Sequence, residues 1–136
     1  MRLVDTNVLL HTVSNNAADD HKKEMAATIL KEPDLALSVQ VLQEFYYQST
    51  RPSGPAGLNH EQAMEFLGQF GSLPVQEITL DLFNRAIANV QDFGLSYWDA
   101  AILAAAKMLG CDAVYSEDMS HMQDYGGLRV INPFVE

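Results

Sequence analysis

A strand-to-helix junction carries the residues on which the fold prediction depends, Leu-Val-Asp-Thr-Asn-Val-Leu-Leu at positions 3–10. The apolar run Arg2–Val4 predicts a short strand, and Asp5 directly after it is a good N-cap for a helix that continues to Val13. Asp5 is therefore expected at the carboxyl end of the first strand. Open α/β sheets bind their ligands at that edge, so Asp5 has two compatible interpretations, as a helix cap and as a site residue.

Four further short runs predict strands, and they alternate with longer segments of helical pattern. The expected strands are 35–37, 75–78, 113–115 and 128–131, and the expected helices are 20–31, 39–48, 60–70, 80–92 and 97–109. Asn59, Thr79 and Ser96 are suitable N-caps, and Gly110 stands where a helix-ending glycine is common. This alternation predicts an α/β fold with a mostly parallel sheet, because parallel strands need helical crossovers.

The composition indicates one globular domain over residues 1–136. Hydrophobic residues make up 48% of the chain, which is enough for a core of its own. No apolar run approaches the roughly 18 residues of a membrane span, and no signal-peptide pattern follows Met1, so we expect a cytoplasmic protein. The single cysteine, Cys111, excludes an internal disulfide and is interpreted as a small buried residue. The Pro- and Gly-rich stretch 51–57 is expected to be a surface loop.

The charge balance is strongly acidic, with 18 acids, 8 bases and a net charge of −10. Charge alone argues against nucleic-acid binding, since affinity for phosphate usually comes from Lys and Arg. That argument fails where acids hold metal ions, because the cations then supply positive charge locally. The positions of individual acids are therefore more informative than the net charge.

Three further acids stand at informative positions. Asp99 lies in the first turn of a helix that is apolar nearly all round, where a buried carboxylate is costly unless it is paired or bound; its spacing from Ser96 also fits a capping box. Glu44 lies on the flank of an apolar helical stripe, and a solvated side chain is the simpler interpretation. Asp118 follows the expected strand 113–115, where an ordinary turn residue is the simpler interpretation.

Together these acids give a stronger signal than each one alone, because most of them are expected on the ligand-binding side of the sheet. Oxygen ligands suit Mg²⁺ or Mn²⁺ rather than zinc. The sequence lacks the phosphate-binding glycine motifs GxGxxG and GxxxxGKS/T. The histidines show no metal-binding spacing and are interpreted as solvated or capping residues, namely His11, His21, His60 and His121.

The order of these motifs resembles that of the PIN-domain ribonucleases, and among them the VapC-type toxins of toxin–antitoxin pairs. The resemblance covers the whole chain and rests on residues 3–10, Leu-Gln-Glu-Phe-Tyr-Tyr at 42–47, Ser-Tyr-Trp-Asp-Ala-Ala at 96–101, Ser-Glu-Asp at 116–118, and Gly-Leu-Arg-Val-Ile-Asn-Pro-Phe at 127–134. It implies a three-layer α/β/α PIN-like fold whose sheet has four to five strands in the order 3-2-1-4-5. Strands 1 and 4 then meet at the switch point, with Asp5 and Asp118 beside the crevice.

The resemblance also implies an endoribonuclease that hydrolyses RNA phosphodiester bonds with Mg²⁺ or Mn²⁺. By position, the catalytic and metal-binding quartet is Asp5, Glu44, Asp99 and Asp118, with Asp5 and Asp99 as the primary metal ligands. Supporting residues that hydrogen-bond or bind the metal through water are Asn7, Ser116 and Glu117. Candidates for phosphate contacts are Arg51, Arg85, Lys107 and Arg129.

The partners implied by the resemblance are RNA, commonly transfer RNA or a ribosomal RNA loop, a cognate antitoxin protein, and a second copy of the chain in a homodimer. No membrane partner is expected. An antitoxin segment would lie over the acidic groove, with a basic side chain reaching the acids. Some aromatic residues could line such a groove, although core packing is the simpler interpretation: Phe45, Tyr46, Tyr47, Phe66 and Phe70.

Three other functions compete with this interpretation. A PIN-type RNA-processing nuclease without an antitoxin is barely separable from the toxin by sequence, although the compact length favours the toxin. A signalling receiver domain needs an acidic pair after strand 1 and a lysine after the last strand, whereas Thr6 and Asn7 follow Asp5 and the last lysine is Lys107. A non-catalytic RNA- or protein-binding module is disfavoured because all four acids are present.

Overall fold

Six strands form one sheet in the order β3-β2-β1-β4-β6-β5 in the computed structural model, which describes residues 1–135. The strands are β1 (Arg2–Val4), β2 (Leu35–Ser38), β3 (Val75–Gln76), β4 (Ala113–Tyr115), β5 (Asp124–Tyr125) and β6 (Leu128–Ile131). Neighbouring strands are parallel except for β5 and β6, which are antiparallel. Leu3 of β1 lies opposite Ala36 of β2 on one side and Val114 of β4 on the other.

The strand order confirms the predicted 3-2-1-4-5 topology, in which the fifth predicted strand is β6. The switch point lies between β1 and β4, as expected. The sheet has six strands rather than four to five, because Asp124–Tyr125 adds the short strand β5 beside β6. The turn between them contains Gly126 and Gly127 with φ values of 66° and 93°, a left-handed conformation that favours glycine.

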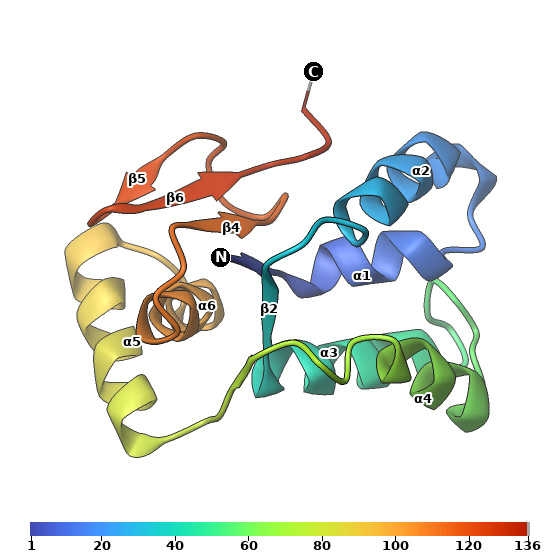
Figure 1. Ribbon diagram of the computed structural model, residues 1–136, viewed down its shortest axis with the longest axis horizontal. Helices are drawn as coiled ribbons and strands as arrows, with labels where there is room; N and C mark the ends of the chain where they lie inside the picture. Colours follow the sequence, from blue (N-terminus) through green and yellow to red (C-terminus); the bar gives the residue numbers. More distant parts are fainter. Residues whose placement is uncertain (136) are drawn as a thin grey trace.

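The helices lie on both sides of the sheet and make three layers. Figure 1 shows α5 and α6 on one side of β2 and α1 to α4 on the other. The helices are α1 (Thr6–Val13), η1 (Ala17–Asp19, 3-10), α2 (Asp20–Ile29), α3 (Val39–Thr50), α4 (His60–Gly68), α5 (Leu80–Phe93) and α6 (Tyr97–Met108). The predicted N-caps Asp5, Asn59, Thr79 and Ser96 each accept a backbone hydrogen bond in the first turn.

The core explains why α6 is apolar nearly all round. All residues from Ala100 to Ala106 are buried, because the sheet covers one face of the helix and α5 covers another. The predicted aromatic cluster divides into two groups. Phe45 is fully buried and stacks on Phe66 at 4.8 Å, whereas Tyr46 and Tyr47 are exposed. Within residues 1–135, no helix has the length and apolar character that a membrane crossing requires.

The loop at 51–57 follows α3 in the chain and contacts the segment after α1. The backbone N–H of Asn15 donates to Pro55 O at 3.0 Å, and the Asn15 side chain donates to Ala56 O at 2.6 Å. Pro52 and Ser53 are exposed, as predicted for a surface loop, but Ala56 is buried. The loop therefore holds the far end of α1, the helix that Asp5 caps.

We expect Gly54→Ala to destabilise the protein and Gly68→Ala to leave it unchanged or more stable. A Cβ at position 54 would lie 2.3 Å from the backbone oxygen of Gln48, so the loop must shift, at about 1–3 kcal/mol. Position 68 ends α4 with no atom within 4 Å of an added Cβ, and alanine favours helix there by up to about 1 kcal/mol. Urea unfolding followed by circular dichroism measures both, and equal effects would contradict the steric argument.

Candidate active site

Asp5 is the buried centre of the candidate site. It directly follows β1 and caps α1, and only 4% of its surface is exposed. Its Oδ1 accepts the Thr6 backbone N–H at 2.7 Å, and its Oδ2 accepts the Ser116 hydroxyl at 2.7 Å. The two predicted roles of Asp5 are therefore compatible in space, since one oxygen caps the helix and the other faces the residues after β4.

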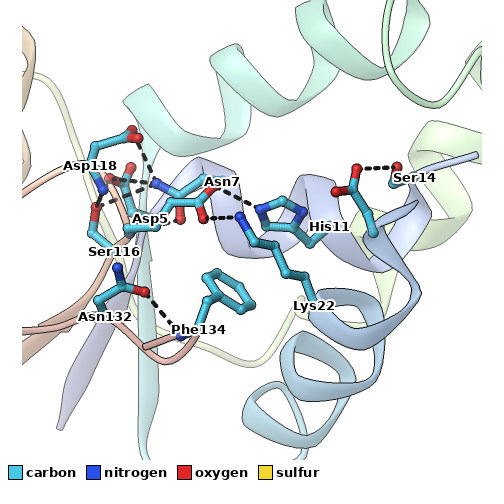
Figure 2. A network of polar contacts seen from close by, with 11 residues as sticks. Asp5, Asn7, His11, Ser14, Lys22, Ser116, Asp118, Asn132 and Phe134 are labelled. Carbon is cyan, nitrogen blue, oxygen red and sulfur yellow. Dashed lines mark hydrogen bonds and ion pairs between the residues drawn. The ribbon is translucent and has the colours of Figure 1, made fainter. Parts of the chain in front are cut away.

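Asn7 and Ser116 connect Asp5 to Asp118 (Figure 2). The Nδ2 of Asn7 lies 3.4 Å from Asp5 Oδ2, 3.3 Å from Ser116 Oγ and 3.1 Å from Asp118 Oδ2. Ser116 is fully buried, and its Oγ also accepts the Asp118 backbone N–H at 3.1 Å. These contacts bring together two of the predicted acids and two of the predicted supporting residues at the β1–β4 switch point.

The environment of Asp5 strongly favours its neutral form. Burial raises the pKa of the Asp5 carboxyl from 3.8 to about 7, and the negative charges of Asp118 and Glu44 raise it further, against the lowering effect of the hydrogen bonds from Ser116 and Thr6. A carboxylate held in this way is stabilised by any nearby cation. The neighbouring oxygen donors suit a hard divalent ion such as Mg²⁺ or Mn²⁺, which is the group that the sequence analysis predicts.

Asp99 and Glu44 lie on the same side of the site, on α6 and α3. Burial and the negative charge of Asp118 raise the pKa of Asp99, which the Ser96 side chain partly opposes. Glu44 is exposed, and its Oε1 accepts Gln40 Nε2 at 2.8 Å. The same Gln40 nitrogen lies 3.3 Å from the Trp98 carbonyl, so Gln40 connects α3 to the first turn of α6.

The four acids interact through their charges rather than as one closed set of ligands. Among residues 1–135, no three His, Cys, Asp or Glu side chains lie close enough together to hold a metal ion. The negative charges of Asp118 and Glu44 act on Asp5, and that of Asp118 acts on Asp99. The predicted quartet therefore shares one region in which Asp5 is buried, Asp99 is half-buried, and Glu44 and Asp118 are exposed.

Glu117 differs from the other predicted supporting residues. Its backbone N–H donates to Asn7 Oδ1 at 3.3 Å, but its carboxylate contacts His11 at 2.7 Å and Lys22 at 2.9 Å. Burial alone would raise the pKa of Glu117, but the hydrogen bonds from His11 and Lys22 hold it below its ordinary value. The interpretation of His11 as a solvated or capping residue was wrong, because its side chain is largely buried beside Glu117.

The four bases that the sequence offered for phosphate contacts have other neighbours. Arg85 pairs with Asp81 at 3.2 Å and Arg129 with Asp124 at 3.9 Å, while Arg51 contacts Gln48 and Lys107 contacts the Gly126 carbonyl. Sequence reasoning missed Lys22 and Gln40, which contact Glu117 and Glu44 respectively.

The prediction that Cys111 is buried was wrong, since it is only half-buried. Desolvation raises the pKa of its thiol to about 11, which does not favour a nucleophile.

A model of the PIN-domain family matches residues 2–126, a range that includes all four predicted acids. The chain belongs to the PIN-domain family. A sequence search of curated proteins gave no match. The resemblance noted in the sequence is therefore confirmed at the level of the family and of its three-layer fold.

Solved structures share the fold of this PIN domain at low sequence identity. FitAB bound to the IR36 DNA fragment has a TM-score of 0.72 and 17% identity over 100% of this chain and 97% of that chain. A toxin–antitoxin complex from Klebsiella pneumoniae has a TM-score of 0.69 and 20% identity over 98% of both chains. The Mycobacterium tuberculosis toxin VapC20, described as cleaving the sarcin–ricin loop, has a TM-score of 0.64 and 22% identity over 87% and 90%.

We expect the free energy of unfolding of the metal-free PIN domain to fall as the pH rises from 4 to 7, because of Asp5. The folded state keeps a proton up to about pH 7, whereas the unfolded chain releases it near the ordinary pKa of 3.8. The folded state thus binds more protons in this window, and stability falls by at most about 1.4 kcal/mol per pH unit for this group. Asp5→Asn should remove this slope and Asp92→Asn should retain it, measured by urea unfolding in EDTA. Identical slopes in wild type and Asp5→Asn would contradict the shift.

Proposed function

We propose that this PIN domain is an Mg²⁺- or Mn²⁺-dependent endoribonuclease and the toxin of a toxin–antitoxin pair. The observation that carries the proposal is the buried Asp5 carboxylate at the β1–β4 switch point, joined through Asn7 and Ser116 to Asp118. The negative charges of Asp118 and Glu44 act on Asp5, and that of Asp118 acts on Asp99. Such a concentration of oxygen donors supports a divalent cation site.

Each acid has a role that follows from its position. Asp5 and Asp99 would be the primary metal ligands, because they are the less exposed pair, and Glu44 and Asp118 would complete the site or position water. Asn7 and Ser116 orient the Asp5 and Asp118 carboxylates through their hydrogen bonds. When bound, the cation would lower the pKa of an attacking water and neutralise charge on the phosphate.

The family and its structural neighbours support RNA as the substrate class. The M. tuberculosis neighbour is described as cleaving the sarcin–ricin loop, and the K. pneumoniae neighbour as part of a toxin–antitoxin complex. The net charge of −10 supports the proposal that RNA cleavage depends on metal. An acidic chain repels a phosphate backbone unless cations lie between them. Transfer RNA and ribosomal RNA are the substrates to test first.

We expect purified protein to cut a labelled pool of transfer and ribosomal RNA at one or a few sites with Mg²⁺ or Mn²⁺, and not with EDTA. Asp99→Asn should lower the cleavage rate by more than about 100-fold. Losing an outer-shell partner of a metal costs up to about 100-fold, and Asp99 is proposed as a direct ligand. Asp92→Asn, the same change at an exposed position on α5, is the matched control and should cut like the wild type.

Three results separate the proposal from its competitors. Metal-dependent cutting that Asp99→Asn abolishes would support the nuclease and identify its target class. Cutting that persists in EDTA or in Asp99→Asn would contradict the assigned site. Folded protein that binds RNA without cutting it would indicate a non-catalytic binding module instead.

We also propose a cognate antitoxin and a second copy of this chain as protein partners. A groove between α1, α2 and α4 supports a peptide partner, because it combines apolar side chains with one cation: its lining includes Leu30, Lys31, Phe66 and Phe70. Exposed Tyr46 and Tyr47 on α3 add aromatic surface of a kind enriched at protein interfaces.

We expect light scattering after size exclusion to give about twice the 15.1 kDa chain mass for the protein without antitoxin. The mass should rise further when the protein is co-expressed with the small reading frame adjacent to its gene, if that frame encodes a DNA-binding antitoxin. A monomer at micromolar concentration would contradict the homodimer, and cleavage activity that the adjacent product leaves unchanged would favour an RNA-processing enzyme over a toxin.

A further inference from the structure

The Glu117 carboxylate is held by two side chains from different helices. His11 Nε2 on α1 lies 2.7 Å from Glu117 Oε1, and Lys22 Nζ on α2 lies 2.9 Å from Glu117 Oε2. The His11 and Glu117 side chains are only 14% and 22% exposed, and that of Lys22 is 40% exposed. An ionised carboxylate only accepts hydrogen bonds, so both nitrogens donate to it. The chain has only 8 Lys and Arg residues, and one of them is placed at this carboxylate.

Phe134 covers this arrangement from the segment after β6 (Figure 2). Its ring meets the His11 ring edge-on at a centroid distance of 4.8 Å, and Lys22 Nζ lies 5.5 Å from the Phe134 ring centroid. Asn132 fixes the segment, because its Oδ1 accepts the Phe134 backbone N–H at 2.9 Å and its own N–H donates to His121 Nδ1 at 3.0 Å. Aromatic contacts of this kind stabilise both side chains in this arrangement.

Glu117 is also connected to the candidate active site through its backbone. Its N–H donates to Asn7 Oδ1, which sets the direction of the Asn7 amide and turns Nδ2 toward Asp5 and Asp118. A movement of residue 117 would therefore rotate the Asn7 amide, which contacts both carboxylates. The hydrogen bonds of His11 and Lys22 described above go to Glu117 and not to these two carboxylates, so the hydrogen-bonded route from them to the site passes through Glu117.

We propose that His11 and Lys22, covered by Phe134, are positioning residues that hold Glu117 and, through Asn7, orient the Asp5–Asp118 pair. The proposal deepens the proposed nuclease function and rests on it for the activity measurement alone. It assigns a role to Glu117 that differs from metal binding through water, because its carboxylate is occupied by His11 and Lys22. It also assigns a role to the carboxy-terminal segment, which brings Phe134 over α1 and α2.

The first test is a ¹H–¹⁵N correlation spectrum of the Asn7 side-chain amide, identified by its loss in Asn7→Ser. Lys22→Met keeps the alkyl stem and removes the charge, and Glu117→Gln keeps the shape and weakens both contacts. Both variants should shift the Asn7 amide peaks, and Phe134→Ala should shift them in the same direction. Lys23→Met, the same change at the exposed neighbouring lysine on α2, is the matched control and should leave them in place.

The second test measures Mn²⁺ affinity by calorimetry and, with RNA, kcat and KM. Lys22→Met should lower Mn²⁺ affinity and kcat by about tenfold, the lower end of the effect of losing an outer-shell partner, with KM unchanged. Lys22→Met should have no further effect when Glu117 is already Gln, since both changes act on one contact. Thermal unfolding of each variant confirms that the fold is retained at the assay temperature.

Two results would overturn the proposal. Unmoved Asn7 amide peaks in folded Lys22→Met and Glu117→Gln would show that the pair has no influence on the site. A loss that persists in the Glu117→Gln background and appears in KM would mean that Lys22 contacts RNA directly. If the wild type cuts no RNA, the proposed function fails, but the amide peaks still decide whether Lys22 and Glu117 position Asn7.

Discussion

A carboxylate buried at the end of β1 is the constraint on which the site depends. Asp5 is accommodated only because its oxygens are hydrogen-bonded by Thr6 and Ser116, from the start of α1 and the end of β4. Burying such a group is costly, and desolvation raises the pKa of Asp5 to about 7. The fold thus holds a buried carboxylate whose neutral form is favoured, which is an arrangement typical of functional sites rather than of stable cores.

The parallel sheet makes this arrangement possible. Because β1 and β4 run side by side in the same direction, the residues that follow them meet at one edge although more than a hundred positions separate them. The apolar helix α6 supports the same edge, since its buried stretch from Ala100 places Asp99 at the first turn. Gln40 connects this turn to Glu44 on α3, so each acid is supported by a different element.

Local features of the fold could be predicted because their physical causes lie within a few residues. The capping box of Asn59 and Gln62 joins positions three apart, and the burial of Ala100–Ala106 follows from the absence of a polar face on that helix. The short strand β5 could not be predicted in this way. Asp124 and Tyr125 have no run of strand-forming residues, and only their pairing with β6 makes them extended.

The sequence by itself determined the order of the α-helices and of five of the six strands, the candidate acids and the family resemblance, because periodicity, caps and short motifs are local properties. Only the tertiary structure decided which base lies beside the site and where each side chain points. Lys22 and His11 meet Glu117 across 95 and 106 positions, whereas Arg85 pairs with Asp81 within its own helix. Contacts over such separations depend on how the chain packs. The same packing brings the Glu117 carboxylate to His11 and Lys22, although Asp118 is its neighbour in the sequence.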